Sequence, residues 1–276
     1  MRWKIRNVAA LLAAVAALSP SPLSAQYLIS VKEEIELGQR TQREVKSKTP
    51  EVKDQEVLDY VRQIGRTLAA RAGGPKYPYS FSVANYREIN AFALPGGPVW
   101  IHRATISSAR NEAQIASVLA HEIAHIAQRH TADQLTKNLI ANGLLGLLGA
   151  VLGNEGGART AQAAAQVMAN GYMLKFSRDD EREADRVGAR IMRQAGWDPR
   201  EMIAFMELLR GRQGRDPGSV EVFLSSHPAP AERAALLRGE LRGTSGGRKD
   251  SQRFRDVRAR VQRMAPAPAL RARSTR

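Results

Sequence analysis

Cysteine is absent from the 276 residues of this chain, and its absence narrows what the protein can be. No disulfide framework is possible, and no thiolate is available as a metal ligand. Any metal ion bound here would have to be held by histidine, aspartate or glutamate, a set more typical of catalytic than of structural sites. The missing cysteine also leaves no residue for lipid attachment behind a cleaved leader.

Long apolar runs are scarce as well. The run near the N-terminus, Val8 to Leu18, is short for a membrane span, and it follows a basic start that contains Arg2, Lys4 and Arg6. Small residues ending at Ala25 come next. This pattern predicts a signal peptide over residues 1–25 that is cleaved after Ala25. We therefore expect export to the periplasm, and an uncleaved membrane anchor is the alternative.

Acidic residues are outnumbered, since 27 Asp and Glu face 42 Lys and Arg. The net charge of +15 becomes +12 when the three cations of the leader are removed. For an exported protein, this balance indicates peripheral contact with an anionic membrane, and no nucleic-acid-binding signature accompanies it. Much of the excess lies between Arg238 and Arg276, so we expect residues 243–276 to form a basic, flexible tail, which could contain one basic helix from Ser251 to Met264.

The chain does contain the motif His121-Glu122-Ile123-Ala124-His125. Residues four apart lie on one face of a helix, so the two histidines could bind one ion while Glu122 reaches a water beside it. Asn111 as an N-cap, with Gln114 three residues later and apolar residues at helical spacing beyond, predicts a buried helix. The alternative is an accidental histidine pair. Three of the five histidines lie within ten residues, which favours the metal site.

A catalytic metal also needs a ligand from another element. The stretch from Phe176 to Asp185 is rich in acidic residues in a helical pattern. Glu181 and Asp185 share one face, so the simplest arrangement makes Glu181 the ligand and lets Asp185 accept the free ring N–H of a ligand histidine. The alternative is a solvated helix face whose acids pair with neighbouring arginines.

Residues 79–85, 91–94 and 98–102 alternate in polarity between turn sequences, which predicts short antiparallel strands before the histidine helix. A sheet edge beside a metal can hold an extended peptide through main-chain hydrogen bonds, so Asn90, Ala91 and Phe92 are candidates for a substrate-binding edge strand. An ordinary scaffold sheet explains the same residues. The expected class is α+β, mostly helical with a small antiparallel sheet beside the active-site helix, in one domain over residues 26–242.

These motifs resemble those of a known family. His121-Glu122-x-x-His125 and Phe176-Ser177-Arg178-x-x-Glu181-x-x-Ala184-Asp185 are similar to motifs of the zinc metallopeptidases that include the CAAX prenyl protease, the membrane heat-shock protease HtpX and the periplasmic chaperone-protease BepA. Residues 90–97 resemble the strand before the active helix in that family. Ser226-His227-Pro228 with Arg233 is similar to a late element of its periplasmic members. The likeness spans roughly residues 31–241, without the transmembrane helices or helical repeats of some members.

The resemblance implies a zincin-like fold of the gluzincin type and one Zn²⁺ per chain, held by His121, His125 and Glu181. It implies further that Glu122 is the general base and that Asp185 supports a ligand histidine. His227 and Arg233 are candidates for stabilising the oxyanion of the tetrahedral intermediate. His227 could instead occupy the open coordination position of the zinc and act as a latch.

We therefore expect a periplasmic zinc metalloendopeptidase that hydrolyses peptide bonds of misfolded or stalled envelope proteins, with Glu122 taking a proton from the attacking water. One alternative is a chaperone-like holdase of the same fold without significant proteolysis. Another is a basic envelope-binding module in which the metal is incidental.

Overall fold

The computed structural model describes residues 30–141 and 175–270. The expected signal peptide with its cleavage point, and the last six residues of the expected tail, lie outside these residues. The described elements are, in chain order, α1 (Val31–Lys48), α2 (Gln55–Ala69), β1 (Ser80–Ala84), β2 (Ala91–Ala93), β3 (Pro98–His102), α3 (Arg103–Ser108), α4 (Glu112–Ala127), α5 (His130–Ala141), α8 (Arg178–Gln194), α9 (Arg200–Gln213), the 3₁₀ turn η1 (Pro217–Ser219), α10 (Glu221–Ser226), α11 (Pro230–Glu240) and α12 (Gln252–Arg263).

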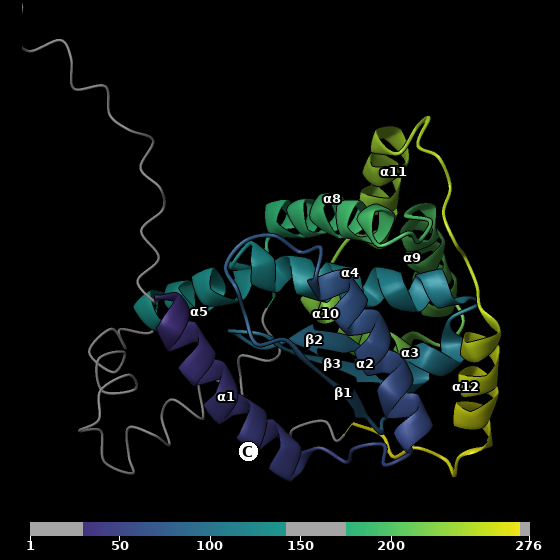
Figure 1. The fold of residues 1–276 in the computed structure, drawn as a ribbon, viewed down its shortest axis with the longest axis horizontal. Coiled ribbons are helices and arrows are strands. Elements are labelled where there is room, and N and C mark those ends of the chain that lie inside the picture. The colour runs from purple at the N-terminus through teal and green to yellow at the C-terminus, as the bar shows by residue number, and fades with distance from the viewer. Residues whose placement is uncertain (1–29, 142–174, 271–276) are drawn as a thin grey trace, which may run out of the picture.

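Helix α4 is the central element, with α8 on one side of it and the sheet on the other (Figure 1). Every one of its residues is buried. Asn111 caps the helix by accepting the N–H of Gln114 at 3.0 Å, as predicted, whereas the Gln114 side chain accepts the N–H of Arg110. A helix whose residues are all buried is covered on every side by other elements. The two histidines of α4 are therefore held away from bulk water.

The three strands form a sheet in the order β1-β3-β2. β2 pairs antiparallel with β3, with Phe92 opposite Trp100. β1 pairs parallel with β3, with Ser80 opposite Pro98, which corrects the expectation of a wholly antiparallel sheet. Alternating polarity indicates which face of a strand is buried but not the direction of its neighbour. The α+β class itself is confirmed.

The β2–β3 hairpin turns tightly through two glycines. The Leu94 N–H donates to the Pro98 carbonyl at 2.8 Å, and Gly96 and Gly97 have φ of 71° and 129°. A Cβ on Gly96 would lie 2.4 Å from the carbonyl oxygen of Glu34 in α1. Glycine therefore permits both the turn and the close approach of α1 to the end of the hairpin.

Helix α8 packs closely across α4, above it in Figure 1. A Cβ on Gly188 would lie 3.3 Å from the main chain of Ala120 and 3.0 Å from Cε of Met202. Only a residue without a side chain fits at this crossing without displacing its neighbours. The close crossing brings the face of α8 that carries Glu181 and Asp185 against α4.

The described residues after 242 are folded, which corrects the expected flexible tail. Helix α12 buries Phe254, Val257 and Val261 against α2 and α3. Beyond the helix, the N–H of Leu270 donates to a carboxylate oxygen of Glu88 at 2.9 Å. A helix needs only one apolar stripe to pack, because arginines on its other faces keep their charges in water. The folded region therefore extends past the expected boundary at residue 242.

Candidate metal centre

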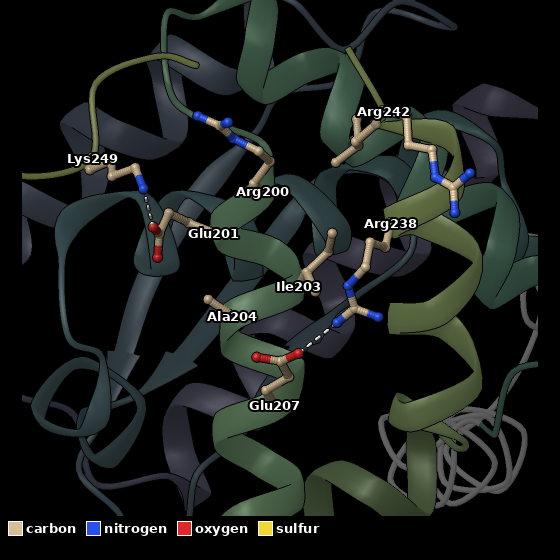
Figure 2. A pocket seen from close by; sticks show the side chains of 9 residues that line it. Arg200, Glu201, Ile203, Ala204, Glu207, Arg238, Arg242 and Lys249 are labelled. Carbon is tan, nitrogen blue, oxygen red and sulfur yellow. Dashed lines mark hydrogen bonds and ion pairs between the residues drawn. The ribbon is translucent and has the colours of Figure 1, made fainter. Parts of the chain in front are cut away.

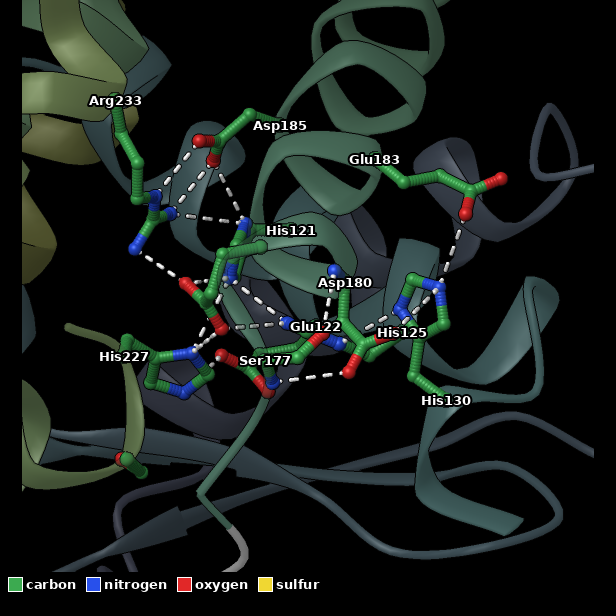
Figure 3. A network of polar contacts seen from close by, with 12 residues as sticks. His121, Glu122, His125, His130, Ser177, Asp180, Glu183, Asp185, His227 and Arg233 are labelled. Atoms are coloured by element: carbon green, nitrogen blue, oxygen red, sulfur yellow. Dashed lines mark hydrogen bonds and ion pairs between the residues drawn. The ribbon is translucent and has the colours of Figure 1, made fainter. Parts of the chain in front are cut away.

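His121 and His125 project from the same face of α4 (Figure 3). Both are buried, and their Nε2 atoms lie 3.0 Å apart. The ring of Phe176 stacks on the ring of His125, with the centroids 3.8 Å apart. The four-residue spacing places both histidines on one face of the helix, as predicted, so that two imidazole nitrogens point at the same position.

Helix α8 brings a carboxylate to this point. Ser177 caps α8 in a reciprocal capping box with Asp180, so the helix begins just before Glu181. Glu181 Oε1 lies 3.3 Å from Nε2 of His125, and Oε2 lies 3.6 Å from Nε2 of His121. The structure brings together the three residues expected to be ligands.

A fourth donor comes from the turn between α10 and α11. Nδ1 of His227 lies 2.9 Å from Oε1 of Glu181 and 3.3 Å from Nε2 of His121. Ala229, in a left-handed conformation with φ of 57°, turns the chain from this histidine into α11. One donor atom from each of four buried residues lies within 4.8 Å of the others: His121, His125, Glu181 and His227.

The spacing of these donors fits a small tetrahedral metal ion. Ligand atoms bound at ~2.0–2.1 Å in tetrahedral geometry lie about 3.3 Å apart. Five contacts between these donors run from 2.9 to 3.6 Å, and all four donors lie within 4.8 Å of one another. Imidazole and carboxylate groups are also the ligand types that a catalytic zinc uses.

Glu122 is the buried carboxylate beside the cluster. It is 0% exposed, and neither of its carboxylate oxygens has a hydrogen-bond partner among the described residues. An ion-pair contact of 3.5 Å joins its Oε1 to Nε2 of His227. Burial raises the pKa of Glu122 above its ordinary value, against the opposing effect of His227 and His121. A buried carboxylate without a hydrogen-bond partner is costly, and such groups are typical of sites that act on a ligand.

Asp185 and Arg233 lie on the outer side of the cluster (Figure 3). Asp185 Oδ1 lies 3.0 Å from Nδ1 of His121. The Arg233 guanidinium binds both oxygens of Asp185, at 2.6 and 2.7 Å, and also pairs with Glu181. Asp185 is therefore placed as predicted. Arg233 was a candidate donor to the oxyanion. Its guanidinium is instead bound to the carboxylates of Asp185 and Glu181.

The charges around Glu181 keep it ionised. Burial alone would raise the pKa of Glu181, but its electrostatic interactions with His227, Arg233 and His121 hold it well below its ordinary value. Burial also opposes the ionisation of Asp185, and Arg233 outweighs it, so this pKa is lowered too. An ionised Glu181 beside the imidazoles of His121 and His125 forms a site suited to a divalent cation, and the ionised Asp185 lies just outside it.

Two contacts of His125 were not predicted. His130 lies with its Nδ1 at 3.1 Å from Nδ1 of His125, and Phe176 stacks on its ring. The only sequence signal for His130 was its membership of the histidine group. Phe176 was noted only as the first residue of the second motif that resembles the metallopeptidase family. The His130 contact depends on the chain reversal at Arg129, whose φ is 62° and which no spacing rule describes.

The three residues expected to form a substrate-binding edge, Asn90, Ala91 and Phe92, differ in how their main-chain groups are paired. The main-chain N–H of Asn90 donates to Thr105, and its carbonyl accepts from Thr105 and from the N–H of His102, so the main chain of Asn90 is occupied. Antiparallel pairing alternates, so Phe92 faces β3 with its main-chain groups whereas those of Ala91 and Ala93 point away. Ala91 and Ala93 are thus the residues of β2 whose main-chain groups do not pair with β3, and both are buried.

A cavity of about 550 Å³ lies between α9 and α11, and none of the residues that line it belongs to the donor cluster (Figure 2). Its cations are largely paired within the protein, since Arg238 contacts Glu207 at 2.6 Å and Lys249 contacts Glu201 at 3.2 Å. A cavity that does touch His121 has a volume of about 20 Å³, roughly enough for one water.

Comparison with known proteins gives the family. Residues 56–241 match peptidase family M48. The chain is 33% identical over 220 residues to the beta-barrel assembly-enhancing protease of Escherichia coli (strain K12), covering 78% of this chain and 45% of that protein. It is 40% identical over 148 residues to the mitochondrial metalloendopeptidase OMA1 of Saccharomyces cerevisiae, covering 52% of this chain and 41% of that protein. The chain thus spans about half the length of the curated relatives it matches.

The matched region contains α4, α8 and the turn that carries His227, and hence all four donors of the cluster. It also contains Glu122 and the pair formed by Asp185 and Arg233. The family match and the site geometry fall on the same residues. This chain belongs to peptidase family M48.

Proposed function

We propose that this protein is a zinc-dependent metalloendopeptidase. One observation carries the proposal: a buried carboxylate without a hydrogen-bond partner, Glu122, adjoins a cluster of imidazole and carboxylate donors spaced for one ion. Peptide hydrolysis at a metal needs such a base beside the ligands. The family and the name of the yeast relative, a metalloendopeptidase, support the same reaction.

His121, His125 and Glu181 would hold the ion, one per chain. When bound, zinc polarises a carbonyl group and lowers the pKa of water toward ~7. Glu122 accepts a proton from the attacking water and passes it to the leaving amine. Because burial raises its pKa, the Glu122 carboxyl can hold that proton between the two transfers.

The outer residues keep the ligands in place. Asp185 accepts the Nδ1–H of His121, which directs the Nε2 lone pair at the cluster. Arg233 compensates the charges of Asp185 and Glu181 in a region from which water is excluded. We assign Arg233 this supporting role because its guanidinium is bound to the two carboxylates.

His227 is proposed as a latch. Its Nδ1 is placed as a fourth donor, and its Nε2 lies 3.5 Å from the general base. A catalytic site needs three protein ligands and one open position. The imidazole of His227 would therefore have to move before a peptide and water could both reach Glu122.

For the substrates, we propose misfolded or stalled envelope proteins in the periplasm, presented as extended chains beside Ala91 and Ala93. The name of the bacterial relative, a beta-barrel assembly-enhancing protease, and the leader-like residues 1–25 support this proposal. The net charge of +15 supports peripheral contact with anionic membrane. Across residues 30–141 and 175–270, no helix is both long and apolar enough to cross a membrane.

The test is Glu122→Gln, with Glu36→Gln, a half-buried glutamate of α1 that pairs with Lys32, as the control. Zinc per chain is measured by elemental analysis, and cleavage is measured with casein. We expect about one zinc in each protein and a loss of cleavage of at least ~100-fold in Glu122→Gln only. A parent chain that binds unfolded protein but cleaves nothing would support the holdase in place of the enzyme. A parent that holds no stoichiometric zinc would contradict the proposed metal.

A further inference from the structure

His130 lies against the outer side of the candidate ligand His125 (Figure 3). The chain leaves α4 at Ala127 and reverses through Arg129, whose φ is 62°. This reversal places His130, the first residue of α5, so that its Nδ1 lies 3.1 Å from Nδ1 of His125. His130 is buried at 5% exposure.

The position of the cluster decides which atom donates in this contact. Nε2 of His125 faces the other donors, at 3.0 Å from Nε2 of His121 and 3.3 Å from Glu181. An imidazole binds a metal through an unprotonated nitrogen, so the ring proton of His125 must be on Nδ1. That N–H then donates to Nδ1 of His130, which must itself be unprotonated.

The proton of neutral His130 is consequently on Nε2, and a carboxylate is present to accept it. Nε2 of His130 lies 3.3 Å from Oε2 of Glu183 in α8. Glu183 is in turn held by the side-chain amide of Gln128, which donates to its other oxygen at 2.5 Å. A continuous chain of donors and acceptors therefore runs from His125 through His130 to Glu183.

We propose that His130 is a positioning residue for the metal ligand His125, with Glu183 fixing the tautomer of His130. The inference rests on the proposed zinc function and adds a residue to it. Each helix α4 histidine then has an outer partner of its own, Asp185 for His121 and His130 for His125. An outer acceptor holds the ring in its binding orientation and makes the bound nitrogen more basic.

The experiment compares His130→Asn with His130→Leu, two side chains of nearly equal size. Asn places its Oδ1 where the Nδ1 of histidine lies and can accept the N–H of His125, whereas Leu cannot. Zinc affinity is measured by competition with a coloured chelator, and the visible spectrum of the Co²⁺-substituted protein reports the ligand geometry. We expect about a 10–100-fold weaker zinc affinity and an altered Co²⁺ spectrum for Leu, and near-parental values for Asn.

His102→Leu is the control for loss of a buried histidine as such. His102 is also buried, and its Nδ1 contacts the carbonyl of Glu88 at 3.0 Å, away from the cluster. We expect this variant to bind zinc like the parent even if it is less stable. If His130→Leu fails to fold, the zinc affinity of Glu183→Ala tests the inference instead. Asp179→Ala, at an exposed position on the same helix, is its control. We expect about a threefold or greater loss of zinc affinity for Glu183→Ala alone.

Parental affinity and Co²⁺ spectrum in His130→Leu would overturn the inference while leaving the proposed function intact. Equal losses in His130→Asn and His130→Leu would also overturn it, because size and not the acceptor would then matter. A parent chain that takes up no zinc would overturn the proposed function and this inference with it.

Discussion

Oδ1 of Asp185 lies 3.0 Å from Nδ1 of His121 and accepts its ring N–H, so a residue of α8 fixes the orientation of a side chain on α4. The same carboxylate is bound by Arg233 of α11 through two hydrogen bonds. Three helices far apart in the sequence thus meet in one buried contact. The geometry of the cluster depends on the packing of these helices as well as on the histidine motif.

We expect Asp185→Asn to weaken zinc binding by about 10–100-fold, because a neutral amide is a poorer acceptor for the His121 N–H. It should also lower the free energy of unfolding by about 3 kcal/mol, since the buried Arg233 loses one of its two carboxylate partners. Chelator competition and urea denaturation measure the two effects. Asp179→Asn, on the exposed face of α8, is the control. Unchanged zinc affinity in Asp185→Asn would show that the contact does not orient the ligand.

The parts of the site that were predicted are those that depend on helical spacing. His121 and His125 are four apart on α4, and Glu181 and Asp185 are four apart on α8. The meeting of these two pairs was predicted from the chemical requirement for a third ligand. The two helices meet because they cross closely at Gly188, and no pattern of residue spacing in the sequence indicates this crossing.

The parts that were missed depend on chain direction and on local backbone conformation. Alternating polarity in β1 does not reveal that it runs parallel to β3. His130 reaches His125 only because Arg129 adopts a left-handed conformation, which the sequence does not signal for an arginine. A helix near Phe254 was expected, but its packing against the domain was not, because the basic charge was given more weight than three apolar residues at helical spacing.

The packing of α12 predicts a large effect of Phe254→Ala. The Phe254 side chain is 1% exposed, so its removal leaves a cavity and should lower the free energy of unfolding by about 3–5 kcal/mol. Gln262→Ala, on the exposed side of the same helix, should change it by less than ~0.5 kcal/mol. Urea denaturation followed by circular dichroism measures both. Equal, small effects would mean that the C-terminal segment does not contribute to the folded domain.

His102 predicts a specific loss of stability in mild acid. Burial lowers its pKa from the ordinary 6.5 to about 4, so the unfolded chain takes up a proton at a higher pH than the folded one. Above pH 6.5 His102 is neutral in both states and does not reduce the free energy of unfolding. As the pH falls from 6.5 toward 4, protonation of the unfolded chain lowers that free energy by about 3 kcal/mol.

The measurement compares the parent with His102→Leu by urea denaturation across this pH range, with chelator present so that release of metal does not contribute. We expect the stability of the parent to fall more steeply than that of the variant. Because the cluster histidines are the same in both proteins, the difference between the two curves isolates His102. If the free energy of unfolding fell equally with pH in both proteins, the pKa of His102 would not be lowered in the folded state.

The latch proposal predicts that His227→Ala increases cleavage. Its imidazole lies within 3.3 Å of His121 and 3.5 Å of Glu122, so its removal opens the position that a peptide and water need, while three donors remain for the ion. We expect at least a several-fold faster cleavage of casein with about one zinc retained per chain. Ser225→Ala, on the exposed side of α10, should cleave like the parent. Unchanged or slower cleavage by a zinc-loaded His227→Ala protein would exclude the latch and favour a role for this histidine in the reaction itself.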